Sequence, residues 1–206
     1  MPTASPRAHW DNVYATKRDN EVSWFQEKAS LSLDLIRSAG AGRGSALIDI
    51  GGGASRLVDA LLDEGCTDIS VLDVAEAALS AAKARLGARA GRVHWIAADV
   101  TQWKPPRQYD LWHDRAAFHF LTEANDRAAY VERLMQALAP GGHAVIATFA
   151  PDGPERCSGL PVVRYDAASL GATLGSGFVL QQTRREDHRT PFATMQRFQY
   201  SLFRRR

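Results

Sequence analysis

The chain alternates between short apolar runs and longer amphipathic stretches through its first 149 residues. The apolar runs contain many β-branched and aromatic residues, a pattern typical of strands buried on both faces. They cover residues 46–50, 68–73, 92–97, 108–114 and 143–149. Helical spacing of apolar residues marks 30–39, 56–62, 74–86 and 125–138. This alternation predicts an α/β fold built around a parallel sheet.

The pattern changes after residue 149. Residues 150–165 are rich in proline and glycine and predict a long loop of the kind that carries binding functions. Asp166 is the expected N-cap of a short helix that ends at Gly175. Two further strands, 178–185 and 193–203, are joined by a short connection, so we expect them to pair as an antiparallel hairpin.

A glycine-rich turn follows the first strand. Residues 45–55 read S-A-L-I-D-I-G-G-G-A-S, and a strand, a glycine turn and a helix in this order open a nucleotide-binding unit. Gly51, Gly52 and Gly53 let the backbone approach a ligand closely. A dinucleotide fingerprint needs a third glycine where Arg56 stands, and the phosphate-loop ending G-K-[ST] is absent. The turn therefore disfavours a dinucleotide-dependent oxidoreductase.

An acidic residue ends the second strand. Asp73 lies about 20 residues past the glycine turn, where an acid in this topology reaches the ribose hydroxyls of a bound nucleotide. A carboxylate suits this position because it accepts hydrogen bonds from both hydroxyls. The alternative is an N-cap for the helix over 74–86, and the two roles are compatible.

Four motifs in order resemble those of the class I S-adenosylmethionine (SAM)-dependent methyltransferases. They are D-x-G-x-G-x-S from Asp49, the acid Asp73, A-D-V over 98–100 and L-x-P-G-G over 138–142. Ser55 stands where the family's glycine motif usually has its last glycine. The aromatic N-terminal segment and the C-terminal tail further resemble a bacterial subfamily of small single-domain enzymes with unassigned substrate.

The resemblance implies a fold, a cofactor and roles for several residues. The fold is a Rossmann-like seven-stranded sheet of order 3-2-1-4-5-7-6, with five strand–helix units, helices on both faces and an antiparallel C-terminal hairpin. The cofactor is SAM and the product S-adenosylhomocysteine (SAH). Asp99 accepts a hydrogen bond from the adenine amino group, and the backbone of Val100 serves the adenine ring. The implied cofactor contacts are Trp10, Tyr14, Trp24, Asp49, Gly51, Gly52, Gly53, Asp73, Val74, Asp99, Val100 and Asp114.

We expect one domain over residues 1–206. Residues 1–29 form an aromatic N-terminal arm, 30–149 the SAM-binding core, and 150–206 the substrate loop and the C-terminal hairpin. So much aromatic surface in the arm must pack onto something. Either the arm docks on the edge of the sheet, or it closes over SAM as in the methyltransferases that it resembles. These two hypotheses are compatible.

Three residues are candidates for the reaction itself: Asp114, Arg115 and His188. Asp114 or its carbonyl can hold the SAM ammonium or a substrate cation, and Arg115 can hold a carboxylate bidentately. The alternative is an Asp–Arg pair that only stabilises the strand end. His188 is the first choice for a general base, against the alternative of an exposed turn histidine. His119 is expected to be packed rather than catalytic.

The two cysteines predict no metal site. Cys66 and Cys157 lack the spacing of metal ligands or of a disulfide framework. Cys157 is either a soft ligand for a metalloid or a small loop residue. Cysteine usage of this kind is typical of a reducing compartment, so we expect a cytoplasmic protein.

The composition and the absence of one signature narrow the range of possible methyl acceptors. The chain has 206 residues and a formal net charge of +2, which is too small to favour nucleic acid. No apolar run approaches the ~20 residues needed to span a membrane. The amino-methylation signature [DNS]-P-P-[YFW] is replaced by D-R-A-A at 114–117. We expect direct in-line methyl transfer to a small molecule. The alternatives are a protein side chain as acceptor and SAM binding without turnover, and the oligomeric state stays open.

Overall fold

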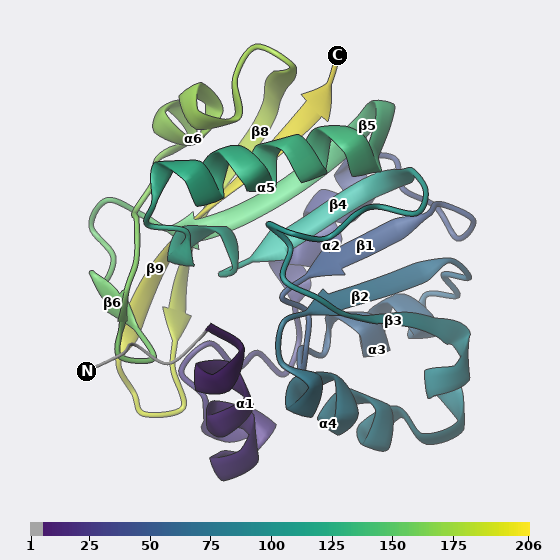
Figure 1. Ribbon diagram of the computed structural model, residues 1–206, viewed down its shortest axis with the longest axis vertical. Coiled ribbons are helices and arrows are strands. Elements are labelled where there is room, and N and C mark those ends of the chain that lie inside the picture. Colours follow the sequence, from purple (N-terminus) through teal and green to yellow (C-terminus); the bar gives the residue numbers. More distant parts are fainter. Residues whose placement is uncertain (1–5) are drawn as a thin grey trace.

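The computed structural model describes residues 6–206, which fold around one seven-stranded sheet (Figure 1). The strands lie in the order β3-β2-β1-β4-β5-β9-β8. Their bounds are β1 Leu47–Ile50, β2 Ile69–Asp73, β3 Val93–Ala97, β4 Tyr109–Arg115, β5 Leu138–Phe149, β8 Phe178–Arg189 and β9 Met195–Arg205. Strands β1 to β5 are parallel, whereas β9 is antiparallel to both β5 and β8. Because β8 and β9 are the sixth and seventh strands of this sheet along the chain, the predicted order 3-2-1-4-5-7-6 and the C-terminal hairpin are confirmed.

Helices cover both faces of the sheet, as predicted (Figure 1). The α-helices are α1 Pro6–Thr16, α2 Ser30–Ser38, α3 Leu57–Asp63, α4 Glu76–Leu86, α5 Ala124–Ala137 and α6 Ala167–Leu174. Short 3-10 turns are η1 Asp19–Glu21, η2 Gly87–Arg92 and η3 Phe118–Phe120, and a two-stranded pair is made by β6 Arg156–Cys157 and β7 Leu160–Pro161. Helices α2, α3 and α4 share one apolar core, and α5 and α6 share the other.

The central strands are apolar on both sides because they separate these two cores. In β1, Leu47 belongs to the core under α2 and α3, while its neighbour Ile48 belongs to the core under α5. Successive side chains of a strand point to opposite faces, so a strand between two helical layers reads as a continuous apolar run. All four residues of β1 and all five of β2 are buried. The polar exceptions are Asp49, Ser70 and Asp73.

One of the five expected strand–helix units has no helix. The connection from β3 to β4 is irregular, and the buried indole of Trp103 packs near Tyr109 and Trp112, with ring centroids 6.3 and 6.4 Å apart. A single large side chain therefore covers the part of the sheet where the topology predicts a helix.

Three local details also differ from the prediction. Ala29, not Ser30, occupies the N-cap position of α2. The segment over 138–142 is the start of β5, with a bulge opposite β4, rather than a free turn. Strand β8 extends to Arg189, whereas the predicted strand ended at residue 185. Residues 186–189, expected in the hairpin connection, therefore belong to the strand. The Asp166 cap is confirmed, because its side chain accepts a hydrogen bond from the Ser169 amide.

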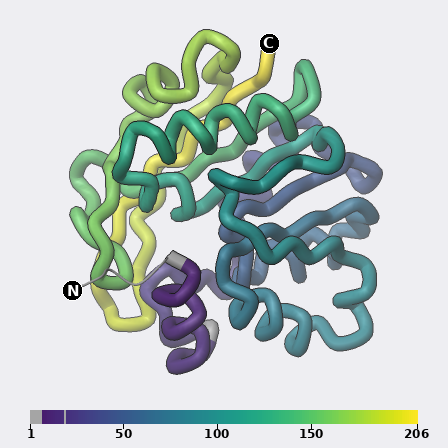
Figure 2. Tube along the Cα trace, viewed as in Figure 1, coloured from purple at the N-terminus to yellow at the C-terminus, as the bar shows by residue number. Residues whose placement is uncertain are grey.

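Helix α1 of the N-terminal arm lies against α4, as both views of the backbone show (Figures 1 and 2). The Asp11 carboxylate accepts a hydrogen bond of 3.3 Å from the Ala77 amide in the first turn of α4. A carboxylate is favourable there because the N-terminus of a helix carries free N–H groups and partial positive charge. Within residues 6–206, no helix is both long and apolar enough to cross a membrane.

The turn after β4 is anchored by a buried carboxylate. Asp114, fully buried, accepts hydrogen bonds from the Tyr130 hydroxyl at 2.7 Å and from the amides of Ala117 and Phe118 at 2.9 and 3.1 Å. Burial raises the pKa of Asp114 to about 6, and these donors oppose the increase. Ala116 in this turn has φ +68°, a left-handed conformation that costs a non-glycine residue about 1–2 kcal/mol. The anchored carboxylate fixes this strained turn.

We predict that Tyr130→Phe lowers the free energy of unfolding by about 1–3 kcal/mol. The substitution removes one of the three donors to Asp114 and leaves the indole N–H of Trp112, which donates to the same hydroxyl, without its acceptor. Urea denaturation measures the change. Gln136→Ala on the exposed side of α5 is the control and should stay within about 0.5 kcal/mol of the parent protein. Equal effects of the two substitutions would contradict the anchoring role.

Candidate cofactor and acceptor site

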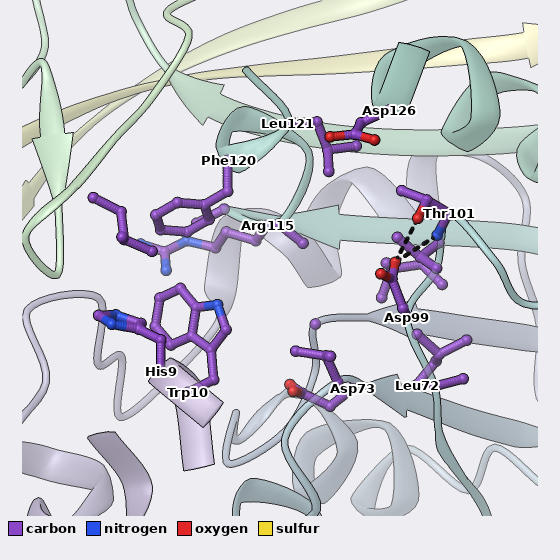
Figure 3. A pocket seen from close by; sticks show the side chains of 18 of the residues that line it. His9, Trp10, Leu72, Asp73, Asp99, Thr101, Arg115, Phe120, Leu121 and Asp126 are labelled. Atoms are coloured by element: carbon purple, nitrogen blue, oxygen red, sulfur yellow. Dashed lines mark hydrogen bonds between the residues drawn. The ribbon is translucent and has the colours of Figure 1, made fainter. Parts of the chain in front are cut away.

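A cavity of about 470 Å³ opens at the carboxyl ends of the central strands, beneath helix α1 (Figure 3). Its lining falls into two parts. An acidic part contains Asp73, Val74, Asp99 and Val100, and an aromatic part contains Trp10, Tyr14, Trp24 and Phe120. Gly51 and Arg115 also line it. The topology of an open α/β sheet predicts a ligand site at this edge.

Asp73 is a buried carboxylate with few donors. Its Oδ1 accepts a hydrogen bond of 2.8 Å from the Ala75 amide, and the Gly53 amide also bonds the carboxylate. Burial raises the pKa of Asp73 to about 7, with the nearby charge of Asp49 adding to the increase. Additional donors would stabilise the ionised form. Because Asp73 bonds an amide just before α4, the compatible structural role is also present, although Ala75 holds the cap position.

The Asp99 carboxylate is oriented by hydrogen bonds within its own turn. Its Oδ1 accepts hydrogen bonds from the amide and the hydroxyl of Thr101, at 2.9 and 2.7 Å. Both bonds reach the same oxygen, so the carboxylate is fixed in orientation beside Val100 at the cavity wall. Figure 3 shows Asp99 and Asp73 projecting from neighbouring segments toward the same space.

The glycine turn is packed so tightly that side chains would not fit. A Cβ atom on Gly53 would lie 2.5 Å from Asp73 Oδ2, and one on Gly51, whose φ is +65°, would lie 2.8 Å from the Ala117 Cβ. The serine that departs from the family motif has a local role, because Ser55 Oγ accepts a hydrogen bond of 3.1 Å from the Leu57 amide at the start of α3. A hydroxyl thus satisfies one of the free N–H groups of that helix.

The aromatic residues of the arm face the cavity. Trp10 packs edge to face against Trp24 and Phe120, with ring centroids 5.6 and 5.0 Å apart, and Tyr14 lies 6.4 Å from Trp24. The sequence alone left open whether this surface meets a sheet edge or a ligand site. In the structure it forms one wall of the cavity.

The segment between the arm helix and α2 is tied to the C-terminal hairpin. Arg115 Nη1 donates to the Trp24 carbonyl at 2.9 Å, and Gln26 Nε2 donates to Glu186 Oε1 at 2.8 Å. The imidazole Nε2 of His188 lies 2.8 Å from the Ser23 carbonyl oxygen. Residues 23–26 are therefore held by β4 and β8 together.

Two of the three predicted reaction residues need correction. The Asp114 side chain does not line the cavity, because the turn after β4 uses its carboxylate. His188 is neither in a turn nor exposed, since it lies in β8 and faces the Ser23 carbonyl. Burial and the charge of Arg115 lower the pKa of His188. Its Nε2 bonds the Ser23 carbonyl, and His188 is not among the residues that line the cavity, so the geometry does not support the general-base prediction.

Arg115 does line the cavity, but it pairs with Glu186 rather than with Asp114. Its Nε donates to the Tyr200 hydroxyl at 2.8 Å, and Nη2 lies 3.6 Å from Glu186 Oε2. The guanidinium also stacks over Phe198, 4.3 Å from the ring centroid. The charge of Arg115 is therefore partly balanced within the protein.

The other two side chains singled out in the sequence are buried. His119 is packed, as expected; its Nδ1 accepts a hydrogen bond of 3.3 Å from the Phe149 amide, and burial lowers its pKa to about 3. Cys157 lines the cavity as a thiol whose pKa burial raises to about 11. Among residues 6–206, no group of three potential metal ligands is present.

Several cavity residues were not predicted. They are His9, Leu72, Thr101, Gln102, Phe120, Leu121, Asp126 and Leu160. Phe120 and Leu121 follow the strand-end motif directly, so their position was a usable signal. Leu160 comes from the loop over 150–165, whose small β6–β7 hairpin brings it to the cavity, and periodicity gave no sign of that.

Comparison with known proteins finds similarity to methyltransferases. Residues 48–144 match the family model described as a methyltransferase domain. This segment of the chain is therefore similar to a methyltransferase domain.

Relatives of this domain are distant. Nodulation protein S of Rhizobium tropici is 25% identical over 121 residues, 59% of this chain and 50% of that protein, so the chain spans about half the length of this curated relative. The 1,6-didemethyltoxoflavin-N1-methyltransferase of Burkholderia thailandensis, solved with 1,6-didemethyltoxoflavin and SAH, has a TM-score of 0.78 at 23% identity, covering 100% of this chain and 92% of that chain. The [4+2]-cyclase SpnF has a TM-score of 0.73 at 16% identity, covering 97% of this chain and 94% of that chain. These two solved structures are similar to this chain in fold.

The cavity fits an adenosine-bearing cofactor. Asp73 is a buried acceptor that is bonded by two backbone amides, and the glycine turn presents backbone where a Cβ has no space. Hydroxyl groups of a ribose supply donors of the kind that a buried carboxylate needs.

We predict that Asp73 makes the free protein less stable as the pH rises. An acid whose folded pKa lies near 7 holds a proton that the unfolded chain has already released, so the free energy of unfolding falls between about pH 4 and pH 7. Asp73→Asn removes this titration. Urea unfolding at pH 5 and pH 8 should show the parent protein losing roughly 1–4 kcal/mol relative to Asp73→Asn.

The matched control is Asp126→Asn, an exposed acid on the same cavity. Its stability relative to the parent should not change over this pH range. A difference between the parent and Asp73→Asn that is the same at both pH values would refute the raised pKa.

Proposed function

We propose that the protein transfers the methyl group of SAM to a small-molecule acceptor by direct in-line displacement. The observation that carries this proposal is the division of one cavity into an acidic part and an aromatic part. The acidic part suits the adenosine of the cofactor. The aromatic part, beneath the arm and beside the β6–β7 hairpin, leaves room for a second molecule.

In this proposal the residues at each strand end bind a different part of the cofactor. Asp73 accepts hydrogen bonds from the ribose hydroxyls, with Val74 beside it. Asp99 accepts from the adenine amino group, and the Val100 backbone serves the ring. Gly51, Gly52 and Gly53 lie along the methionine end, because their backbone is the closest approach that the turn permits.

The methionine end meets both charges that it needs. A second cavity of about 50 Å³ lies beside the glycine turn and is lined by Asp49 and Arg115 as well as by Gly51 and Gly52. Gly51, Tyr14, Trp24 and Arg115 line both cavities, so the two adjoin. An anion and a cation on facing sides complement the ammonium and carboxylate of an amino acid.

The acceptor part has mainly apolar walls. Trp10, Phe120, Leu121 and Leu160 supply them. Methyl transfer from a sulfonium needs alignment of the nucleophile with the methyl carbon, and apolar walls can position an acceptor beside the cofactor. The Burkholderia thailandensis methyltransferase was solved with 1,6-didemethyltoxoflavin bound, which supports a small-molecule acceptor.

Two alternatives remain distinct from this function. A protein side chain as acceptor would have to reach the cavity under the arm. SAM binding without methyl transfer is supported by the similarity in fold to a protein named as a cyclase, because a shared fold does not fix the chemistry.

We predict that Asp73→Ala weakens SAH binding by about 10–150-fold, equivalent to ~1.5–3 kcal/mol for charge-assisted hydrogen bonds. Calorimetric titration with SAH measures the change, with NADH titrated in parallel and Asp63→Ala, an exposed acid outside the cavity, as the matched control. An unchanged dissociation constant in a folded variant removes Asp73 from the cofactor site. Binding of NADH but not of SAH would overturn the cofactor assignment.

The proposed function is tested by turnover. The protein with methyl-labelled SAM should label one or more members of a panel of small thiols, amines, phenols and carboxylates, and release SAH in equal amount. Asp73→Ala should lower the rate at subsaturating SAM. Labelling of proteins alone would favour a protein side chain as the acceptor. Tight SAM binding with no labelled product would favour SAM binding without methyl transfer.

A further inference from the structure

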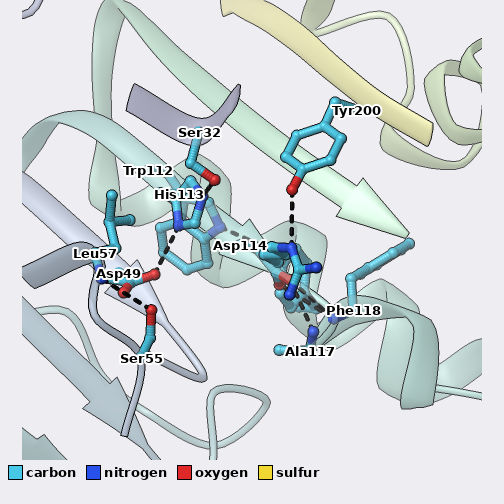
Figure 4. Close-up of polar contacts among 12 residues, drawn as sticks. Ser32, Asp49, Ser55, Leu57, Trp112, His113, Asp114, Ala117, Phe118 and Tyr200 are labelled. Carbon is cyan, nitrogen blue, oxygen red and sulfur yellow. Dashed lines mark hydrogen bonds and ion pairs between the residues drawn. The ribbon is translucent and has the colours of Figure 1, made fainter. Parts of the chain in front are cut away.

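Three buried side chains beside the glycine turn form a hydrogen-bonded chain (Figure 4). Ser32 Oγ lies 2.9 Å from His113 Nε2, and His113 Nδ1 lies 2.7 Å from Asp49 Oδ1. All three residues are almost completely buried, with 1–2% of their surface exposed. Of the three residues, only Asp49 has a role in the cofactor placement described so far.

The fold places these side chains together from three elements. Asp49 of β1 and His113 of β4 are register partners in neighbouring parallel strands, so their side chains project on the same face of the sheet. Helix α2 covers that face and brings Ser32 from its first turn. Two buried polar side chains on neighbouring strands are therefore matched to each other across the sheet.

The chain of donors determines where the protons lie. An ionised Asp49 can only accept, so the proton between the two residues belongs to His113 Nδ1. In a neutral imidazole Nε2 then accepts, and the Ser32 hydroxyl is the donor that it needs. This arrangement uses every nitrogen of the ring and keeps the negative charge on Asp49.

The second oxygen of Asp49 is left without a partner. Oδ2 is buried and has no hydrogen bond, and it faces the turn so closely that a Cβ on Gly52 would collide with it. A buried carboxylate with one neutral donor is poorly compensated. A cation in the adjoining small cavity, which Asp49 lines, would supply the missing compensation.

We propose that His113 and Ser32 are positioning residues that orient Asp49 toward the glycine turn and thereby select the ammonium of the cofactor's amino-acid end. The inference rests on the cofactor placement in the proposed function and requires no particular acceptor. The role differs from simple packing in one respect: it acts on the amino-acid end of the ligand and not on the adenosine.

Two ligands separate these effects. SAH has both the adenosine and the amino-acid end, whereas 5′-methylthioadenosine keeps the adenosine and the thioether but has no ammonium. We expect His113→Phe, which keeps a ring of similar shape without nitrogens, to weaken SAH binding by about 10–50-fold, as expected for a lost interaction with a charged group. Binding of 5′-methylthioadenosine should change by less than about threefold.

His113→Asn is the rescue variant, because its side-chain amide can still donate to Asp49. It should keep SAH affinity within about fivefold of the parent. His94→Gln is the matched control, since His94 is an exposed histidine on β3, and it should change neither ligand. An equal loss for both ligands in His113→Phe, or no loss for either, would overturn the proposal.

A measurement on the parent protein covers the case in which His113→Phe does not fold. Nitrogen-15 NMR of the imidazole should show a proton on Nδ1 of His113 at neutral pH, and Ser32→Ala should shift the Nε2 signal. A ring without a proton on Nδ1 would contradict the proposal. If the parent binds no SAH at all, the cofactor placement fails, an outcome distinct from an unselective effect of His113→Phe.

Discussion

The buried hydrogen bonds of the Asp114 carboxylate fix the turn on which much of the site depends. They fix the turn in which Ala116 is left-handed, and Arg115 and Phe120 on either side of this turn in the chain both line the cavity. Arg115 then bonds the Trp24 carbonyl and so fixes the base of the N-terminal arm. Asp114 was predicted to bind a ligand. In the structure it instead fixes the turn that carries residues lining the cavity.

Three neighbouring strands end in or near buried acids, and each acid has a different set of donors. Asp49 has His113, Asp73 has backbone amides, and Asp114 has Tyr130 with two amides. Burial disfavours the charged form of a carboxylate unless donors or cations compensate it. The best-compensated acid, Asp114, serves the fold, whereas Asp49 and Asp73 keep unfilled acceptor capacity beside the cavities. Incomplete compensation of this kind is typical of sites that bind a ligand carrying donors or positive charge.

The arm and the C-terminal hairpin together determine the acceptor side. Residues 23–26 are tied to β4 and β8, whereas α1 contacts α4 through its Asp11 carboxylate. The aromatic wall contributed by Trp10 and Tyr14 therefore extends from a fixed base. Methyltransferases and a protein described as a cyclase share this fold, so the fold alone does not fix the chemistry.

The sequence by itself determined the sheet and the cofactor edge. Alternating apolar runs, the glycine turn and the spacing of Asp73 and Asp99 are local patterns, and parallel strands bring their carboxyl ends to one edge whatever the details. The pattern marks no helix between residues 97 and 108, and the structure has none there; what the pattern does not show is that Trp103 packs into the core at this place.

Only the tertiary structure decided which polar residues face a ligand. Asp114 and Arg115 are adjacent in the chain, yet one is enclosed by Tyr130 and the other reaches the cavity. His188 looked available because its hairpin was read as shorter than it is. The pairing of His113 with Asp49 spans 64 residues and arises from register between strands. Local sequence specifies which elements form, but whether a side chain is bonded or free depends on partners that only folding brings together.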